Sequence, residues 1–108
     1  MAFLMIALQS CSFQQCHIDQ EFKSSYFNKI SKIQAYDDNL SKPGNFISTK
    51  DWMEFYDVTD YLSLLTDCDF QFSYGEPPMY KSKSDVLSDV RYLKKWYRKN
   101  KCGMTIQK

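Results

Sequence analysis

The chain is poor in residues that interrupt regular secondary structure: its 108 residues include only three glycines and three prolines. Collagen-like fibres and low-complexity disordered chains are rich in these residues, so the composition excludes both classes. No run of eighteen apolar residues occurs, and therefore no ordinary membrane-spanning helix is expected. The length and the 44% hydrophobic fraction are ordinary for one globular domain with a modest buried core.

Residues that could perform chemistry are also scarce. The one histidine, His17, follows Cys16, but no third residue is placed to orient such a pair. The spacing of Cys11, Cys16 and His17 is not that of a zinc site, and no glycine-rich phosphate-binding motif occurs. A net charge of +1 provides no global field for attracting nucleic acid. We therefore predict no catalytic residue, no metal site and no cofactor.

The first eleven residues, MAFLMIALQSC, form a short apolar run that ends at a cysteine. Residues 2–8 carry no charge and are too few to cross a bilayer, but they match the shortest signal-peptide cores. The sequence Leu8-Gln9-Ser10-Cys11 then resembles the lipobox of bacterial lipoproteins, which has leucine, a variable residue, a small residue and cysteine. The resemblance implies that Cys11 is the lipid attachment residue and the first residue of the mature protein. Two or three acyl chains would anchor it stably.

This resemblance predicts a signal peptide over residues 1–10, a tether over 11–17 and a single helical domain over 18–108. No lysine or arginine precedes Lys23, so the true start of the signal is expected some residues upstream. The expected location is the cell envelope, as a periplasm-facing protein anchored in the membrane. Two alternatives remain: residues 2–8 are a buried element of a cytoplasmic protein, or they belong to a signal without lipid.

The rest of the chain predicts a mainly α fold, a small three-helix domain. The first helix is expected from about Ile18 to Tyr36, before the turn YDDNLSKPGN. The second begins after Ser48 as N-cap, with a kink or break near Asp57, and ends near residues 66–67. The third follows Ser82 and stops before Gly103. The apolar positions repeat at helical spacing and predict a shared core of Phe22, Ile30, Trp52, Phe55, Leu62, Val90, Leu93 and Trp96.

One short extended segment is expected near residues 69–74. Phe70, Phe72 and Tyr74 alternate with polar residues, which is the period of a half-buried strand. A strand needs a partner, which would come from the C-terminal MTIQK or from the N-terminal region. The alternative is an extended segment that lies on the helices.

The four cysteines are Cys11, Cys16, Cys68 and Cys102. With Cys11 lipidated, three remain, and an exported protein would be expected to pair two of them. We favour Cys68 with Cys102, because these residues lie at the ends of two predicted helices. The alternative is that both thiols are free and Cys68 is partly buried.

Positive charge is concentrated at the end of the third predicted helix, in YLKKWYRKNKC. Helical spacing puts Arg91, Lys94, Lys95 and Arg98 together beside the apolar stripe, and we call these four residues the basic ridge. Unpaired buried charges are strongly unfavourable, so the ridge is expected to be exposed. It would attract anionic lipid or an acidic protein partner, unless it is simply solvated surface. Nucleic acid is a less favoured partner, although aromatic residues interleave the charges.

The same segment is similar to the tails of small exported bacterial helical proteins, a resemblance that carries no known chemistry. The sequence thus favours a small exported bacterial lipoprotein that acts as an interaction or structural module and is not an enzyme. A cytosolic helical inhibitor or immunity-type protein is the alternative. A small nucleic-acid binder or enzyme is the third hypothesis.

Overall fold

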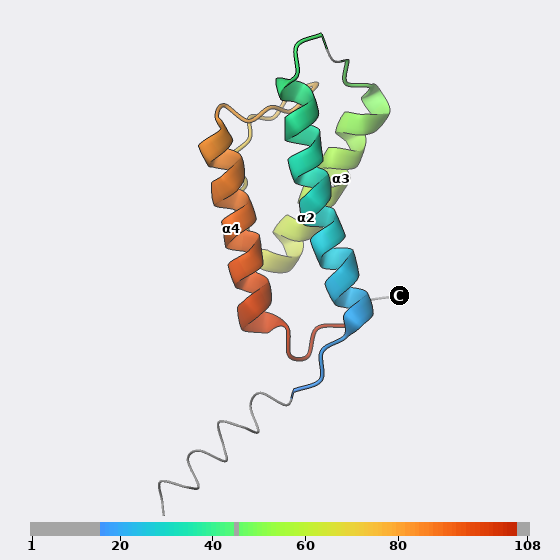
Figure 1. Ribbon diagram of the computed structural model, residues 1–108, viewed down its shortest axis with the longest axis vertical. Coiled ribbons are helices and arrows are strands. Elements are labelled where there is room, and N and C mark those ends of the chain that lie inside the picture. The colour runs from blue at the N-terminus through green and yellow to red at the C-terminus, as the bar shows by residue number, and fades with distance from the viewer. Residues whose placement is uncertain (1–15, 45, 106–108) are drawn as a thin grey trace, which may run out of the picture.

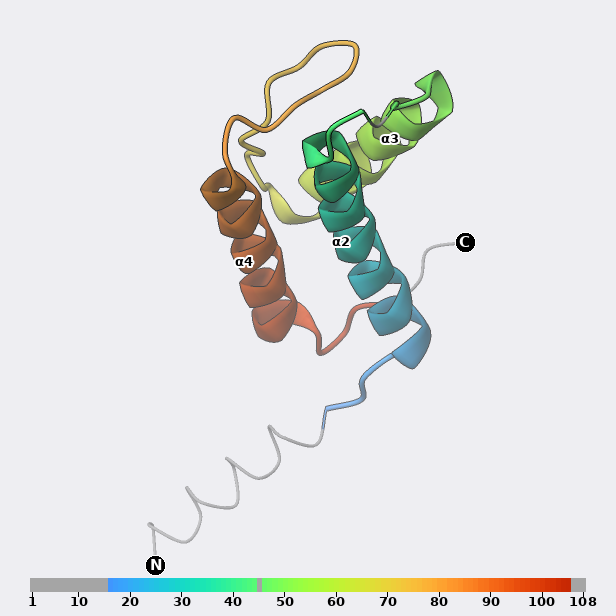
Figure 2. The same cartoon turned by 45° about the horizontal axis from the view of Figure 1, so that its top comes forward.

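The computed structural model describes residues 16–44 and 46–105, and this part of the chain forms three helices (Figure 1). They are α2 (Gln20–Ser41), α3 (Thr49–Thr66) and α4 (Lys83–Asn100). Helix α2 is central and contacts both α3 and α4, as two views of the ribbon show (Figures 1 and 2). The predicted class, a mainly α three-helix domain, is confirmed.

The core forms where the apolar stripes of the three helices meet. Six of the eight predicted core residues are buried, and Trp52 and Trp96 are half-buried at its edge. On each helix the buried hydrophobic side chains are three or four residues apart, because residues at that spacing share one helix face. The buried set on the helices is Phe22, Tyr26, Ile30, Ile33, Tyr36, Phe55, Val58, Leu62, Val86, Val90, Leu93 and Tyr97.

Helix α2 continues beyond the predicted end at Tyr36, to Ser41. Tertiary contacts explain the extra turn: the Tyr36 ring stacks on Phe55 with 4.2 Å between centroids, and its hydroxyl donates to the Pro78 carbonyl. The helix ends one residue before Lys42, whose backbone is extended, as expected for a residue that precedes proline.

Helix α3 begins as predicted, with the Ser48 hydroxyl accepting a hydrogen bond from the Asp51 backbone N–H. It ends at Thr66, where Asp67 adopts a left-handed conformation with φ of 60°. The expected break near Asp57 is wrong, since α3 is one continuous helix. Both Val58 and Thr59 are buried, and the Thr59 hydroxyl donates to the Phe55 carbonyl one turn earlier, so these poor helix formers are held by the core.

The segment that was expected to be strand-like is a loop that folds back on itself. Residues 16–44 and 46–105 contain no β-strand, only one antiparallel bridge in which Ser73 and Met79 exchange backbone hydrogen bonds of 2.8 and 3.1 Å. Phe72 is buried, whereas Tyr74 is 75% exposed, so the alternation fails where the loop turns. The segment lies on the helices, which is the alternative that the sequence left open.

Candidate functional site

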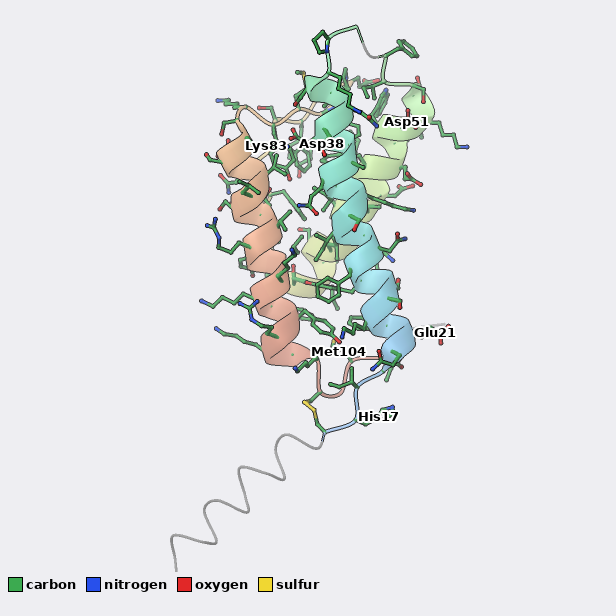
Figure 3. All side chains as sticks on the ribbon, in the orientation of Figure 1. His17, Glu21, Asp38, Asp51, Lys83 and Met104 are labelled. Carbon is green, nitrogen blue, oxygen red and sulfur yellow. A yellow bond between two sulfur atoms is a disulfide. The ribbon has the colours of Figure 1, made fainter. Side chains whose placement is uncertain are left out.

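A disulfide joins Cys16 to Cys102, with 5.6 Å between the two Cα atoms. The predicted pairing of Cys68 with Cys102 is therefore wrong. Cys102 follows α4 at one end of the bundle, whereas Cys68 follows α3 and is buried in the core. Figure 3 shows the bridge beside His17, below the first turn of α2.

The free thiol of Cys68 is sequestered. Burial raises its pKa to about 12, and the nearby carboxylates of Asp89 and Asp69 add to the effect. A thiol that stays protonated is a poor nucleophile and a poor metal ligand. Cys68 therefore packs as a small apolar residue.

An aromatic cluster brings the start of α2 to the end of α4, and so places the two disulfide partners side by side. The ring of Phe22 stacks on Tyr97 with centroids 6.3 Å apart, and Tyr26 stacks on Trp96 at 5.9 Å. The Tyr26 hydroxyl donates to the Leu93 carbonyl at 2.7 Å. These contacts connect positions some seventy residues apart, and no local signal in the sequence predicts them.

All four residues of the basic ridge are exposed, as predicted. Figure 3 shows nitrogen-tipped side chains projecting from the outer side of α4, away from α2. Lys99 and Lys101 continue the positive charge to the disulfide, and Arg98 and Lys99 occupy the last turn of α4, where the helix dipole favours cations. None of the ridge residues forms a salt bridge with another described residue.

We call the surface that carries this charge the disulfide end. It consists of the first turn of α2, the last two turns of α4 and the Cys16–Cys102 bridge. Its exposed or half-buried charged residues are Asp19, Glu21, Lys23, Lys94, Lys95, Arg98, Lys99 and Lys101. Six cations against two carboxylates give a local formal charge of +4, on a chain whose total is +1. The sequence predicted the ridge, but the tertiary structure places the end of α4 beside Cys16.

A groove lies at the opposite end, between the C-terminal half of α2 and the N-terminal half of α3. Its volume is about 120 Å³. Apolar side chains form most of its wall, and three charged residues, Lys32, Asp51 and Glu54, also line it. The remaining lining residues are Ile33, Ala35, Tyr36, Asn39, Ile47, Phe55 and Val58. No pattern in the sequence predicts this groove, because its residues come from two helices and the connection between them.

Two buried carboxylates, Asp89 and Asp37, hold the loop between α3 and α4 and the first residue of α4 in place through hydrogen bonds. Asp89, 3% exposed, accepts hydrogen bonds from the Gln71 N–H at 3.0 Å and the Tyr80 hydroxyl at 2.7 Å. Burial raises the pKa of Asp89, and these two hydrogen bonds oppose the shift. Asp37 is also buried and accepts from the Lys83 ammonium at 3.2 Å. Both carboxylates have partners within the fold, so their arrangement serves structure.

Lys83 also bonds Asp38 at 2.7 Å, at the surface. The hydrogen bond and the positive charge of Lys83 lower the pKa of Asp38. The same hydrogen bond, together with the one to Asp37, raises the pKa of Lys83. The pair connects the end of α2 to the first residue of α4. A periodic pattern in the sequence cannot predict this salt bridge, because its two residues are 45 positions apart.

Cys11, the predicted lipid attachment residue, lies outside the described residues. In the part of the chain that is described, no three histidine, cysteine or acidic side chains form a group able to hold a metal ion. Within the same residues, no helix is both long enough and apolar enough to cross a membrane. No protein-family model, curated protein or solved structure matches the chain.

Proposed function

We propose that this protein is a small lipid-anchored interaction module of a bacterial cell envelope, attached through Cys11 and oriented by the basic ridge against anionic head groups. The observation that carries the proposal is the disulfide between Cys16 and Cys102. It bonds the segment that would carry the lipid to the end of α4, where the positive charge is concentrated.

The length of the tether makes this geometry effective. Cys16 is five positions after Cys11, and a fully extended chain of that length spans at most about 18 Å. Electrostatic attraction to an anionic surface fades within a Debye length, about 8 Å at physiological ionic strength. A tether that ends at the disulfide lets the ridge approach the membrane surface to within this range, whereas attachment at the far end of the bundle would not.

Anchoring and charge reinforce each other in this arrangement. Each cation close to an anionic leaflet contributes about 1 kcal/mol, and stable attachment commonly combines acyl chains with a basic patch. The disulfide also supports export, because such bonds form and persist in oxidising compartments. The lipobox-like sequence, the disulfide and the basic ridge thus all favour a location at the membrane of the cell envelope.

Anchoring is tested in cells by Cys11→Ser, with Ser10→Ala as the matched control. The control keeps a small residue before the cysteine, so labelling by a fatty-acid probe and membrane fractionation should be unchanged. Cys11→Ser should abolish the label and move the protein to the soluble fraction. Equal labelling of both variants would refute lipidation at Cys11.

The orienting role of the ridge is tested separately, on purified full-length protein with Cys11→Ser. Reversal of Lys94, Lys95 and Arg98 to glutamate should leave the circular dichroism spectrum unchanged and should weaken binding to phosphatidylglycerol vesicles at low salt. The control reverses Lys42, Lys50 and Lys81, which are exposed at the opposite end: Lys42 follows α2, Lys50 is in the first turn of α3, and Lys81 precedes α4. Both variants change the net charge equally. Equal loss of binding would mean that the position of the ridge is irrelevant.

A further inference from the structure

The groove between α2 and α3 has the chemistry of a small recognition site. Its inner wall is formed by Ile33, Ile47, Phe55 and Val58, and carboxylates of α3 line it as well. A volume of about 120 Å³ is below the several hundred cubic ångströms of a drug-sized pocket. It approaches the roughly 150 Å³ cavity that holds a benzene-sized molecule, so it suits one side chain.

The charges indicate which side chain fits. Asp51 forms no salt bridge with any described residue, and Glu54 has only the exposed contact with Lys32 at 3.4 Å. Exposed ion pairs of this kind contribute little to the stability of the fold, so another cation can readily replace Lys32 beside Glu54. Counting Lys32, the three charged lining residues carry a net −1, so a cation is the favoured ligand.

The surroundings extend this acidic character. Along α3 the charged residues are Lys50, Asp51, Glu54, Asp57 and Asp60, a net −3 on one helix. Beside the groove, Phe46 precedes the lining residue Ile47 and is 85% exposed. An exposed aromatic next to an apolar groove is typical of a surface that meets a partner protein.

We infer that this groove receives a lysine or arginine side chain from a segment of another protein. The aliphatic stem would lie along the apolar wall, and the cationic head would meet Asp51 and Glu54. Long basic side chains combine these two properties, because they bury their methylene groups and keep the charge near water. Arginine fits best, since its planar head can bond a carboxylate through two N–H groups.

The placement of the groove agrees with this role. Gln20, the first residue of α2, is sixteen residues before Tyr36 of the groove lining, which corresponds to a rise of about 24 Å along the helix. The helix segments that line the groove and the Cys16–Cys102 bridge therefore lie toward opposite ends of the bundle, as the course of α2 shows (Figure 1). An occupant of the groove would leave the basic ridge uncovered, and the inference holds whether or not Cys11 is lipidated.

The test uses full-length Cys11→Ser protein and two acetylated, amidated tripeptides, Leu-Arg-Leu and Leu-citrulline-Leu. Citrulline has nearly the shape of arginine without its charge. Methyl NMR should show that the arginine peptide shifts the resonances of Ile33, Ile47 and Val58 at about millimolar concentration. The citrulline peptide should bind about two- to fivefold more weakly, as expected for loss of an exposed ion pair.

Two variants locate the cation. Asp51→Asn and, as a second variant, Glu54→Gln should each weaken binding of the arginine peptide about two- to fivefold. Asp57→Asn is the matched control, because this exposed carboxylate is on α3 but does not line the groove. Equal binding of the two peptides, or equal loss in the Asp57 variant, would overturn the inference. So would methyl shifts that depend on protein concentration alone, since a second copy would then be the occupant.

Discussion

Removal of the Cys16–Cys102 bridge should lower the free energy of unfolding by an amount that follows from the length of chain it closes. The partners are 86 residues apart, and the chain-entropy model gives about 4–5 kcal/mol for a loop of that size. Domains of this length are stable by only about 5–15 kcal/mol, so the loss is a large share of the total. With about 4 °C per kcal/mol, the melting temperature should fall by about 15–20 °C.

The assay is urea unfolding of the Cys11→Ser protein and its variants, followed by circular dichroism with and without dithiothreitol. Cys16→Ser, Cys102→Ser and the double variant should lose the same stability, because each removes the same bond. The reductant should destabilise the parent protein and leave these three unchanged. Peptide mapping under non-reducing conditions should recover Cys16 and Cys102 in one linked fragment.

Cys68→Ala is the decisive control. It should lower stability through loss of a buried sulfur, yet dithiothreitol should still destabilise it as much as the parent. If the variant were insensitive to the reductant, Cys68 would be a partner in the bridge and the pairing described above would be wrong. Different losses in Cys16→Ser and Cys102→Ser would also refute the reasoning.

Leu93→Ala should lower the free energy of unfolding in urea by about 2–5 kcal/mol, because Leu93 is fully buried. The control on the same helix is Leu87→Ala, which should lower it by less than about 0.5 kcal/mol because Leu87 is 46% exposed. Similar losses in the two variants would refute the packing described for α4. Asp89→Asn should flatten the pH dependence of stability. Because burial raises the folded-state pKa of Asp89, its contribution is fully present below the unfolded value of about 3.8 and is lost as pH rises through the folded value. The exposed Asp38 has the opposite sign: its folded-state pKa is lowered, so Asp38→Asn should remove stability that is present above pH 3.8 and lost on acidification. Melting temperatures of parent and variants measured from pH 3 to 8 check both, and unchanged profiles would contradict the assigned shifts.

The sequence by itself determined the helices and their inward faces. Ser48 and Ser82 could be recognised as caps because a serine followed three residues later by aspartate is a local pattern. The inward positions of Phe22, Ile30 and Leu93 could be predicted because helical periodicity is also local. Exposure of the basic ridge followed from the cost of burying charge, which holds in any fold.

The tertiary structure alone decided which distant parts meet. The last turn of α2 depends on the contacts of Tyr36 with Phe55 and Pro78, and the loop at 69–80 is held by Asp89. The choice of Cys16 as the partner of Cys102 followed from the packing of α2 against α4, which put one end of each helix side by side. Periodicity specifies the face that a helix buries but not its neighbour, so the disulfide end and the groove appeared only when the three helices were assembled.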